Sequence, residues 1–273
     1  MKTLLFIKMH GLGNDYVFVD CFQPEINALI AQADIPALAR RISDRHRGVG
    51  SDGLVLILPD ENADARMRMF NADGTEAQMC GNAIRCVGKY LYESGLCPRS
   101  AMRIATLAGV RELALQVSDG LVQMVTVDMG TPVIAEDELS LDDHSLSFFS
   151  VNIGNPHAVF FRDVMPDTET IHRLGAKIEK HPHFPEGTNV EFIVVRNPQE
   201  LDMRVWERGT GETQACGTGA CASAVAAMHA GYTEHEVTVH LLGGDLIIRL
   251  ENDIVYMTGT ATEAFRGQYL LED

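Results

Sequence analysis

Two cysteines of this chain lie in closely similar segments. Cys80 belongs to MRMFNADGTEAQMCGN (67–82) and Cys216 to MRVWERGTGETQACGT (203–218). At a constant offset of 136 residues the segments share Met67/Met203, Arg68/Arg204, Glu76/Glu212, Gln78/Gln214, Cys80/Cys216 and Gly81/Gly217. A stretch rich in small and apolar residues follows each cysteine and predicts helices over 81–93 and 217–230. Each cysteine is therefore expected at the N-terminus of a helix.

This placement is chemically useful. Unpaired N–H groups and the positive end of the dipole make a helix N-terminus an anion site. The same field lowers the pKa of a cysteine, so a thiolate is expected near neutral pH. If two such helix ends meet one carboxylate, one thiolate can remove an α-proton while the opposite thiol delivers another. The pattern favours a cofactor-independent amino-acid epimerase with Cys80 and Cys216 as its acid/base pair.

The other cysteines carry a different signal. Around the helix axis, Cys86 lies roughly 240° from Cys80, and Cys221 lies roughly 140° from Cys216. Both therefore face away from the capping cysteines, and we expect them in the core. Cys21 and Cys97 belong to no motif. The spacings C-x₅-C and C-x₄-C differ from those of zinc sites, and no metal or other cofactor is expected.

The similarity between the halves extends beyond the cysteines and predicts two related domains. Segment 4–20 resembles 147–161, 54–58 resembles 190–194, and 113–124 resembles 246–257. The expected strands are 3–9, 16–20, 54–58, 66–70, 113–117 and 121–127, then 147–151, 157–161, 190–195, 202–206, 237–241, 246–250 and 254–258. Further helices are expected over 34–44 and 167–180, and a connector over 130–143.

The predicted fold class is α/β (α+β), with two pseudosymmetric domains. Because the helices after the cysteines are apolar nearly all round, each is placed inside a curved mixed sheet that wraps around it. The first domain is expected over 1–120, completed by the tail 265–273, and the second over 121–264.

Composition limits the classes of partner. The 38 acidic and 22 basic residues give a net charge of −16, and no Lys/Arg block offers a nucleic-acid or membrane surface. The start of the chain has four apolar residues before Lys8, too few for a signal peptide, and no apolar run is long enough to span a membrane. Six cysteines are expected as free thiols, as in a cytoplasmic protein.

With ADGTEAQMCGNAIRC and ERGTGETQACGTGACA, together with GLGND (11–15) and GNPH (154–157), the chain resembles the diaminopimelate epimerases over essentially its whole length. The resemblance implies conversion of L,L- to meso-diaminopimelate for lysine and peptidoglycan synthesis, without pyridoxal phosphate, in a cleft between the domains of a homodimer. It implies Cys80 and Cys216 as the bases and His157 and Glu207 as residues that set their protonation. It assigns substrate binding to Asn14, Asn71, Gly81, Asn82, Asn155, Asn189, Arg208, Gly217 and Thr218.

One position departs from many relatives, which carry glutamine near the substrate where Gly53 stands. Two alternatives remain open. The first is a racemase of another amino acid in the same superfamily, such as histidine or proline, although Asn82 stands where proline racemases typically have histidine. The second is a noncatalytic binding protein, or a redox protein that pairs Cys80 with Cys216.

Overall fold

The computed structural model describes residues 2–271, which form two compact units. The first unit contains the residues up to Val127 together with those from Gly259 onward, and the second contains Asp128–Thr258. The sequence placed the divisions at 120/121 and 264/265. The first unit extends further because Val127 still pairs with Leu113 of the preceding strand. No helix within residues 2–271 is both long and apolar enough to cross a membrane.

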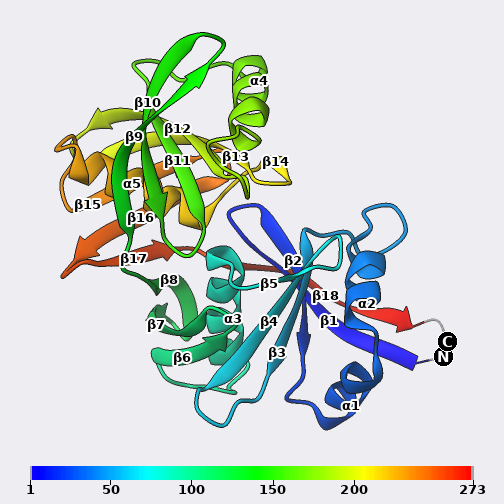
Figure 1. Ribbon diagram of the computed structural model, residues 1–273. Coiled ribbons are helices and arrows are strands. Elements are labelled where there is room, and N and C mark those ends of the chain that lie inside the picture. Colours follow the sequence, from blue (N-terminus) through cyan, green and yellow to red (C-terminus); the bar gives the residue numbers. More distant parts are fainter. Residues whose placement is uncertain (1, 272–273) are drawn as a thin grey trace. The chain divides into compact units, whose positions relative to one another are not determined.

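The first unit is built on a mixed sheet (Figure 1). Its strands are β1 (Lys2–Gly11), β2 (Asn14–Asp20), β3 (Gly53–Leu58), β4 (Ala65–Asn71), β5 (Glu76–Ala77), β6 (Ala101–Thr106), β7 (Gly109–Ser118), β8 (Leu121–Gly130) and β18 (Thr262–Leu271). They pair in the order β18–β1–β2–β3–β4–β6–β7–β8, with β5 as a short hairpin partner of β4. The pairs β2/β3 and β4/β6 are parallel and the others antiparallel.

The second unit repeats this topology. Its strands are β9 (Val133–Leu141), β10 (His144–Asn152), β11 (Pro156–Phe161), β12 (Asn189–Asn197), β13 (Glu200–Glu207), β14 (Gly211–Glu212), β15 (Glu236–Leu241), β16 (Gly244–Glu251) and β17 (Ile254–Gly259). They pair in the order β9–β10–β11–β12–β13–β15–β16–β17, and β14 adds to β13. The pairs β11/β12 and β13/β15 are parallel, at the same places as in the first unit. The predicted two-domain repeat is confirmed.

One helix in each unit is buried nearly all round, as expected. These helices are α3 (Gly81–Glu93), which packs against β1, β2 and β7, and α5 (Gly217–His229), which packs against β10 to β13, β15 and β16. In α5 the run Ala220–Ala227 is buried throughout. Small side chains let the surrounding strands approach the helix axis closely. Because strands surround the helix, no face of it is exposed to solvent, and a polar face is not needed.

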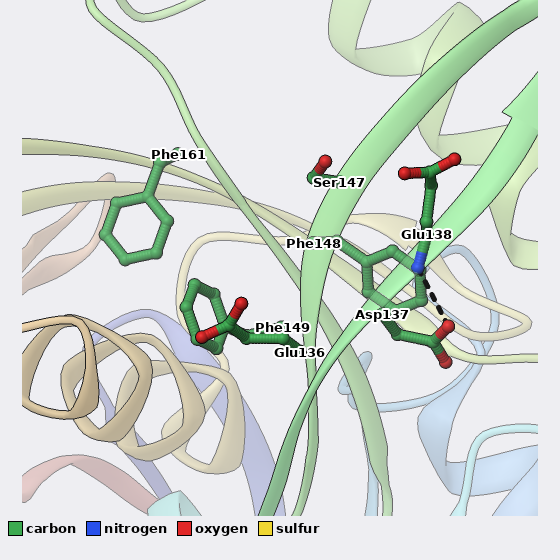
Figure 2. Close-up of a pocket in the computed structure, with 7 residues that line it drawn as sticks. All are labelled: Glu136, Asp137, Glu138, Ser147, Phe148, Phe149 and Phe161. Atoms are coloured by element: carbon green, nitrogen blue, oxygen red, sulfur yellow. Dashed lines mark hydrogen bonds between the residues drawn. The ribbon is translucent and has the colours of Figure 1, made fainter.

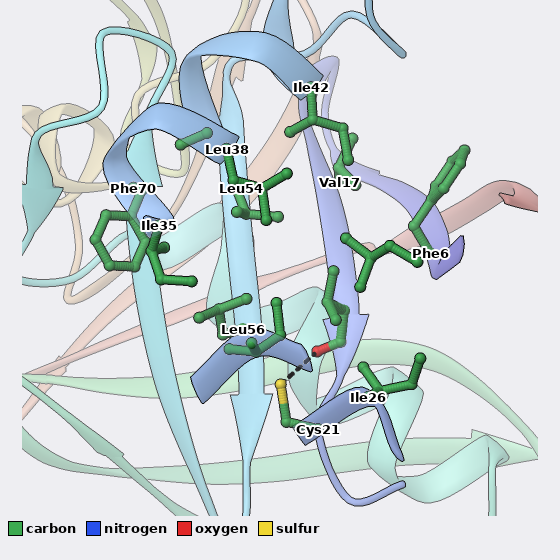
Figure 3. Packing of buried hydrophobic residues seen from close by; sticks show 14 residues of the cluster. Phe6, Val17, Cys21, Ile26, Ile35, Leu38, Ile42, Leu54, Leu56 and Phe70 are labelled. Atoms are coloured by element: carbon green, nitrogen blue, oxygen red, sulfur yellow. Dashed lines mark hydrogen bonds between the residues drawn. The ribbon is translucent and has the colours of Figure 1, made fainter. Parts of the chain in front are cut away.

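The opposite face of each sheet is covered by further helices. In the first unit these are α1 (Pro24–Gln32) and α2 (Ile35–Ser43), and in the second α4 (Thr168–Glu179). Figure 3 shows Val17, Leu54 and Leu56 packing beneath α1 and α2. Side chains alternate along a strand, so the residues between them, such as Val55, are buried on the side of α3. Cys21 belongs to the cluster under α1 and α2.

Several elements differ from the sequence expectations. The connector expected over 130–143 is wrong, because Val133–Leu141 forms strand β9 and pairs with β10 in continuous register. Strands β5, β6, β14 and β18 and helix α1 were not predicted. Helix α1 begins after Gln23, whose side chain makes no capping hydrogen bond, and its start signals are Pro24 at the first position and Glu25 in the first turn. Most of β18 is exposed, and its sequence has little apolar alternation.

Candidate active site

Each repeated cysteine caps the helix that follows it. Cys80 has extended backbone (φ −138°, ψ 121°) and its Sγ accepts the Ala83 N–H at 3.5 Å. Cys216 has similar backbone (φ −112°, ψ 110°) and its Sγ accepts the Gly219 N–H at 3.3 Å. Both sulfurs therefore lie where the N–H groups of a helix N-terminus converge, as the sequence predicted.

In the first unit, amide side chains surround Cys80. Its Sγ lies 3.6 Å from Asn14 Oδ1, and the same oxygen accepts a hydrogen bond from Asn82 Nδ2 at 3.1 Å. Asn82 and Gly81 begin α3 and are buried, whereas Asn14 is half-buried. Three of the residues expected to hold substrate thus stand together at this sulfur.

An acidic residue orients Asn14. Asp52 accepts hydrogen bonds from Asn14 Nδ2 at 2.7 Å and from the Asp15 N–H at 2.9 Å. Arg45 bridges the carboxylates of Asp15 and Asp52 at 2.7 and 2.9 Å. Because the amide nitrogen of Asn14 points to Asp52, its oxygen is turned toward Cys80. The site offers a hydrogen-bond acceptor there, which suits an ammonium group.

A tyrosine completes the surroundings of Cys80. The hydroxyl of buried Tyr16 lies 3.8 Å from Cys80 Sγ. Burial, and secondarily the neighbouring Cys80, raise the pKa of Tyr16 well above its ordinary value. The hydroxyl therefore keeps its proton and can donate it in a hydrogen bond to sulfur.

In the second unit, ionisable groups surround Cys216. The Oγ1 of Thr218 lies 3.6 Å from Cys216 Sγ, and the hydroxyl of Thr213 donates to Glu207. Burial raises the pKa of Glu207, against the opposing effect of hydrogen bonds with Thr213 and Cys216. Gly217 and Thr218 open α5, so the expected carboxylate-binding residues lie at its N-terminus.

The expectation of a readily formed thiolate is wrong for Cys216. Burial, followed by the negative charges of Glu207 and Glu191, raises the pKa of Cys216 well above its ordinary value. The Thr218 hydroxyl and the Gly219 N–H lower it by less. A helix N-terminus favours a thiolate, but at this site burial and two nearby carboxylates outweigh that field.

His157 is held at both ring nitrogens. It lies on β11 and is 1% exposed. Its Nδ1 contacts Glu191 Oε1 at 2.7 Å, and its Nε2 contacts Asn155 Oδ1 at 3.0 Å. His157 and Asn155 were both expected at the site, whereas Glu191 was not. The imidazole cannot rotate without losing both contacts.

The residues expected at the distal end of the substrate fall into two groups. Asn189 donates from Nδ2 to the Pro156 carbonyl at 2.9 Å and accepts the Arg208 N–H at 3.0 Å. The exposed Arg208 donates from Nη1 to the Glu186 carbonyl at 3.0 Å. Asn71, at the end of β4 in the first unit, donates to Thr75 Oγ1 at 3.0 Å. Asn189 therefore positions the backbone that carries Arg208.

Three site residues were missed from sequence, namely Tyr16, Asp52 and Glu191. Tyr16 could have been found from the repeat, since GLGNDY aligned with IGNPH places Tyr16 opposite His157. Asp52 and Glu191 belong to no motif, and their partners Asn14 and His157 are distant along the chain. Only the folded sheet reveals these contacts.

Gly53 has no room for a side chain in this structure. A β-carbon built on Gly53 would lie 2.2 Å from the Phe70 carbonyl oxygen and 3.1 Å from the Tyr16 ring. The glutamine that many relatives carry would therefore require a different local backbone.

Away from these residues, a surface cavity of about 640 Å³ lies in the second unit (Figure 2). It is lined by Glu136, Asp137, Glu138, Ser147, Phe148, Phe149 and Phe161. None of these is one of the expected site residues, and Asp137 Oδ2 is in contact with His183 Nε2 at 2.9 Å. Within residues 2–271, no group of three or more His, Cys, Asp or Glu side chains is arranged to hold a metal ion.

Comparisons with known proteins agree on the family. The sequence pattern of the family described as diaminopimelate epimerase matches residues 6–135 and 149–263. A diaminopimelate epimerase of Desulfitobacterium hafniense is 49% identical over 98% of both chains. One of Pelotomaculum thermopropionicum is 50% identical over 97% of this chain and 98% of its own.

Solved structures share the fold at low identity. A PhzF-family phenazine biosynthesis protein of Bacillus anthracis has a TM-score of 0.74 at 18% identity and covers 99% of this chain and 100% of its own. A hydroxyproline epimerase of Agrobacterium vitis has a TM-score of 0.73 at 19% identity, with 99% and 93% covered. At this identity the likeness concerns the fold alone.

Proposed function

The chain belongs to the diaminopimelate epimerase family, and we propose that it inverts one α-carbon of diaminopimelate with Cys80 and Cys216 as its two bases. The product of L,L-diaminopimelate is then the meso form, which feeds lysine and peptidoglycan synthesis. The observation that carries this proposal is the matched position of the two sulfurs, each at the N-cap of a buried helix in its own unit.

The proton transfers balance without a cofactor. A thiolate takes the α-proton and becomes a thiol, while the electron pair is delocalised into the substrate carboxylate. The N–H groups at the starts of α3 and α5, from Gly81 and Asn82 and from Gly217 and Thr218, stabilise the charge that develops there. The opposite thiol then protonates the other face of the carbon and becomes the thiolate. The two sulfurs exchange roles at each turnover.

The surroundings of the two sulfurs support a division of labour in the free enzyme. The raised pKa of Cys216, caused first by burial, suits the proton donor. When Cys216 is the protonated thiol, Cys80 is the thiolate, and it accepts the α-proton of the isomer that binds to this form of the enzyme. Asn14, oriented by Asp52, presents its oxygen to the substrate ammonium beside Cys80.

The distal end of diaminopimelate is assigned to Asn71, Asn155, Asn189 and Arg208. Arg208 suits the second carboxylate because a guanidinium can donate two parallel hydrogen bonds to it. Asn189 supports this role by accepting the Arg208 N–H at 3.0 Å.

Incubation of the purified protein with L,L-diaminopimelate in heavy water tests the function. Two bases on opposite faces give meso product that carries a solvent deuteron, while recovered substrate initially gains little. Equal deuteration of both pools from the start would show a single shared base and reject the mechanism. Exchange with histidine or proline in place of diaminopimelate would reassign the substrate, and thiol cycling without exchange at carbon would indicate the redox alternative.

We also propose a homodimer in the cytoplasm. The six cysteines are free thiols, the state that a reducing compartment maintains. Sedimentation equilibrium and cell fractionation test the two statements, and a monomer or a secreted protein would contradict them.

A further inference from the structure

We propose that Glu191 is a positioning residue of this reaction, which holds His157 in place and keeps a negative charge beside Cys216 so that this sulfur retains its proton. The inference rests on the proposed two-cysteine function. It concerns only residues of the second unit, and it names a carboxylate to which no motif pointed.

Contacts between Glu191 and His157 define the first part of the role. Glu191 lies on β12 and is fully buried. Its Oε1 lies 2.7 Å from His157 Nδ1, and the Nε2 of the same ring lies 3.0 Å from Asn155 Oδ1. The donor and acceptor roles of the two ring nitrogens depend on the tautomer, but each nitrogen has a partner. Glu191 therefore fixes the orientation of the ring and engages its second nitrogen.

Glu191 is also a neighbour of Cys216. A β-carbon built on Gly219 would lie 2.8 Å from Glu191 Oε1 and 3.2 Å from Cys216 Sγ. Carboxylate and sulfur therefore meet at the same side of this glycine, in the first turn of α5. A negative charge so close to a buried sulfur opposes formation of a second negative charge.

Three ionisable side chains of the second unit lie on strands that pack against α5 near Cys216. The strands under α5 bring His157 from β11, Glu191 from β12 and Glu207 from β13. The first turn of α5, residues 217–220, carries no titratable side chain. These groups are two carboxyls and one imidazole, and burial, Glu207 and Glu191 raise the pKa of Cys216 in that order.

The repeat provides an internal comparison for Glu191. In the first unit β2 runs parallel to β3 with Phe18 opposite Val55, and in the second unit β11 runs parallel to β12 with Val159 opposite Glu191. Val55 is fully buried at this position of the same topology. The architecture therefore accepts an apolar side chain here and does not require an acid.

A buried carboxylate is costly unless its oxygens find partners. The Oε2 of Glu191 has no hydrogen-bond partner within residues 2–271. The second oxygen thus adds no hydrogen bond that stabilises the fold. The carboxylate does, however, place a negative charge beside Cys216. The asymmetry between Val55 and Glu191 matches the different tasks assigned to the two sulfurs.

The test is a titration of each cysteine in the full-length protein. The Cβ resonance of ¹³C-labelled cysteine reports thiol or thiolate, and Cys216→Ser assigns the signal. Glu191→Gln keeps an acceptor for His157 but removes the charge. We expect the Cys216 midpoint to fall by about one pH unit, which gives about tenfold more thiolate below it. The upper-pH limb of kcat/KM should move down with it.

Two further variants separate charge from contact. Glu191→Asp keeps the charge but is too short to reach Nδ1, so the midpoint should stay high while kcat falls. Glu191→Val copies the first unit and should lower the midpoint as Glu191→Gln does. It also provides a folded variant if the glutamine substitution disturbs the site.

Glu179→Gln is the matched control. Glu179 is another buried glutamate of this unit, and it accepts from Trp206 Nε1 and the Gly209 N–H, both at 2.8 Å. Its loss should leave the Cys216 midpoint unchanged. An unchanged midpoint in Glu191→Gln and Glu191→Val would overturn the proposal and leave Glu191 a structural role. Failure of the wild-type protein to invert diaminopimelate would reject the proposed function instead, because the titration does not depend on substrate.

Discussion

The guanidinium of Arg204 contacts the carboxylate of Glu212 through Nε at 2.7 Å. The repeat reproduces this pair in the first unit, where Arg68 Nε contacts Glu76 Oε1 at 2.7 Å. Each pair joins a long strand to the two-residue strand that leads into the cysteine, β13 to β14 and β4 to β5. The matched residues of the repeat therefore include the ion pairs that hold the segment before each cysteine against its sheet.

We expect Glu76→Gln to lower kcat substantially while it changes the free energy of unfolding only slightly. A partly exposed ion pair contributes about 1 kcal/mol or less to stability, but displacement of a catalytic group by about 1 Å can cost 10²-fold in rate. Asp60→Asn is the control, since it breaks a similar pair with Arg66 on the same strand. Kinetics and urea unfolding of both variants decide the matter. Equal kinetic losses would show that the ion pair of Glu76 does not position Cys80.

Substitution of the two capping cysteines should abolish inversion. Loss of one acid/base group typically costs about 10²–10⁴-fold in rate, so Cys80→Ser and Cys216→Ser should fall at least this far. Cys86→Ser and Cys221→Ser are the controls, because both sulfurs are fully buried in the same two helices. Burial raises the pKa of Cys86 to about 12, so it is no candidate base. Full activity in Cys80→Ser would refute the assignment.

Mild oxidation should inactivate the enzyme reversibly. The reaction requires both thiols at one carbon, and sulfurs within that reach can form a disulfide if the chain moves slightly. Activity should return with a thiol reductant. Because Cys80→Ser is itself expected to be inactive, thiol titration follows the oxidation in the variants, and a disulfide that still forms in Cys80→Ser but not in Cys86→Ser or Cys221→Ser would identify a different pair of thiols.

Arg208→Ala should erode discrimination between diaminopimelate and lysine as well as the rate. A site that hydrogen-bonds a substrate group can reject the analogue lacking it by about 10⁴–10⁵-fold, and lysine has no distal carboxylate. We therefore expect wild-type kcat/KM to differ strongly between L,L-diaminopimelate and L-lysine. Comparable values for lysine or histidine in the wild type would point to a broader amino-acid racemase that uses the same two cysteines.

Glu207→Gln should gain stability over the wild type as pH rises. Burial raises the folded-state pKa of Glu207 above its ordinary 4.5, so its contribution to stability is full below 4.5 and is lost as pH rises through the folded value. Asp15→Asn should behave oppositely. Burial is opposed there by Arg45 and Lys8, which lower the pKa of Asp15 below 3.8, so its contribution is present above that value. Thermal unfolding at acidic and neutral pH checks both signs, and parallel curves would contradict the directions.

The sequence alone determined the repeat, the buried helices and the cysteines that cap them. These features follow from local rules: apolar periodicity, glycine after the cap residue and matched segments at a fixed offset. Strand β9 was not predicted because acidic residues and the nearby Pro132 mask its apolar alternation. Pairing with β10 nevertheless orders it along its whole length. Similarly, β18 is ordered by its long pairing with β1, from the other end of the chain.

The tertiary structure alone decided which groups control the sulfurs. Asp52 reaches Asn14 and Glu191 reaches His157 across neighbouring parallel strands, and no spacing in the sequence records these contacts. The sequence predicted a lowered pKa at both cysteines from the helix N-terminus. At Cys216 the fold reversed that direction, because ionisation depends on solvent access and on every charge nearby, and β12 and β13 bring two carboxylates to a buried sulfur.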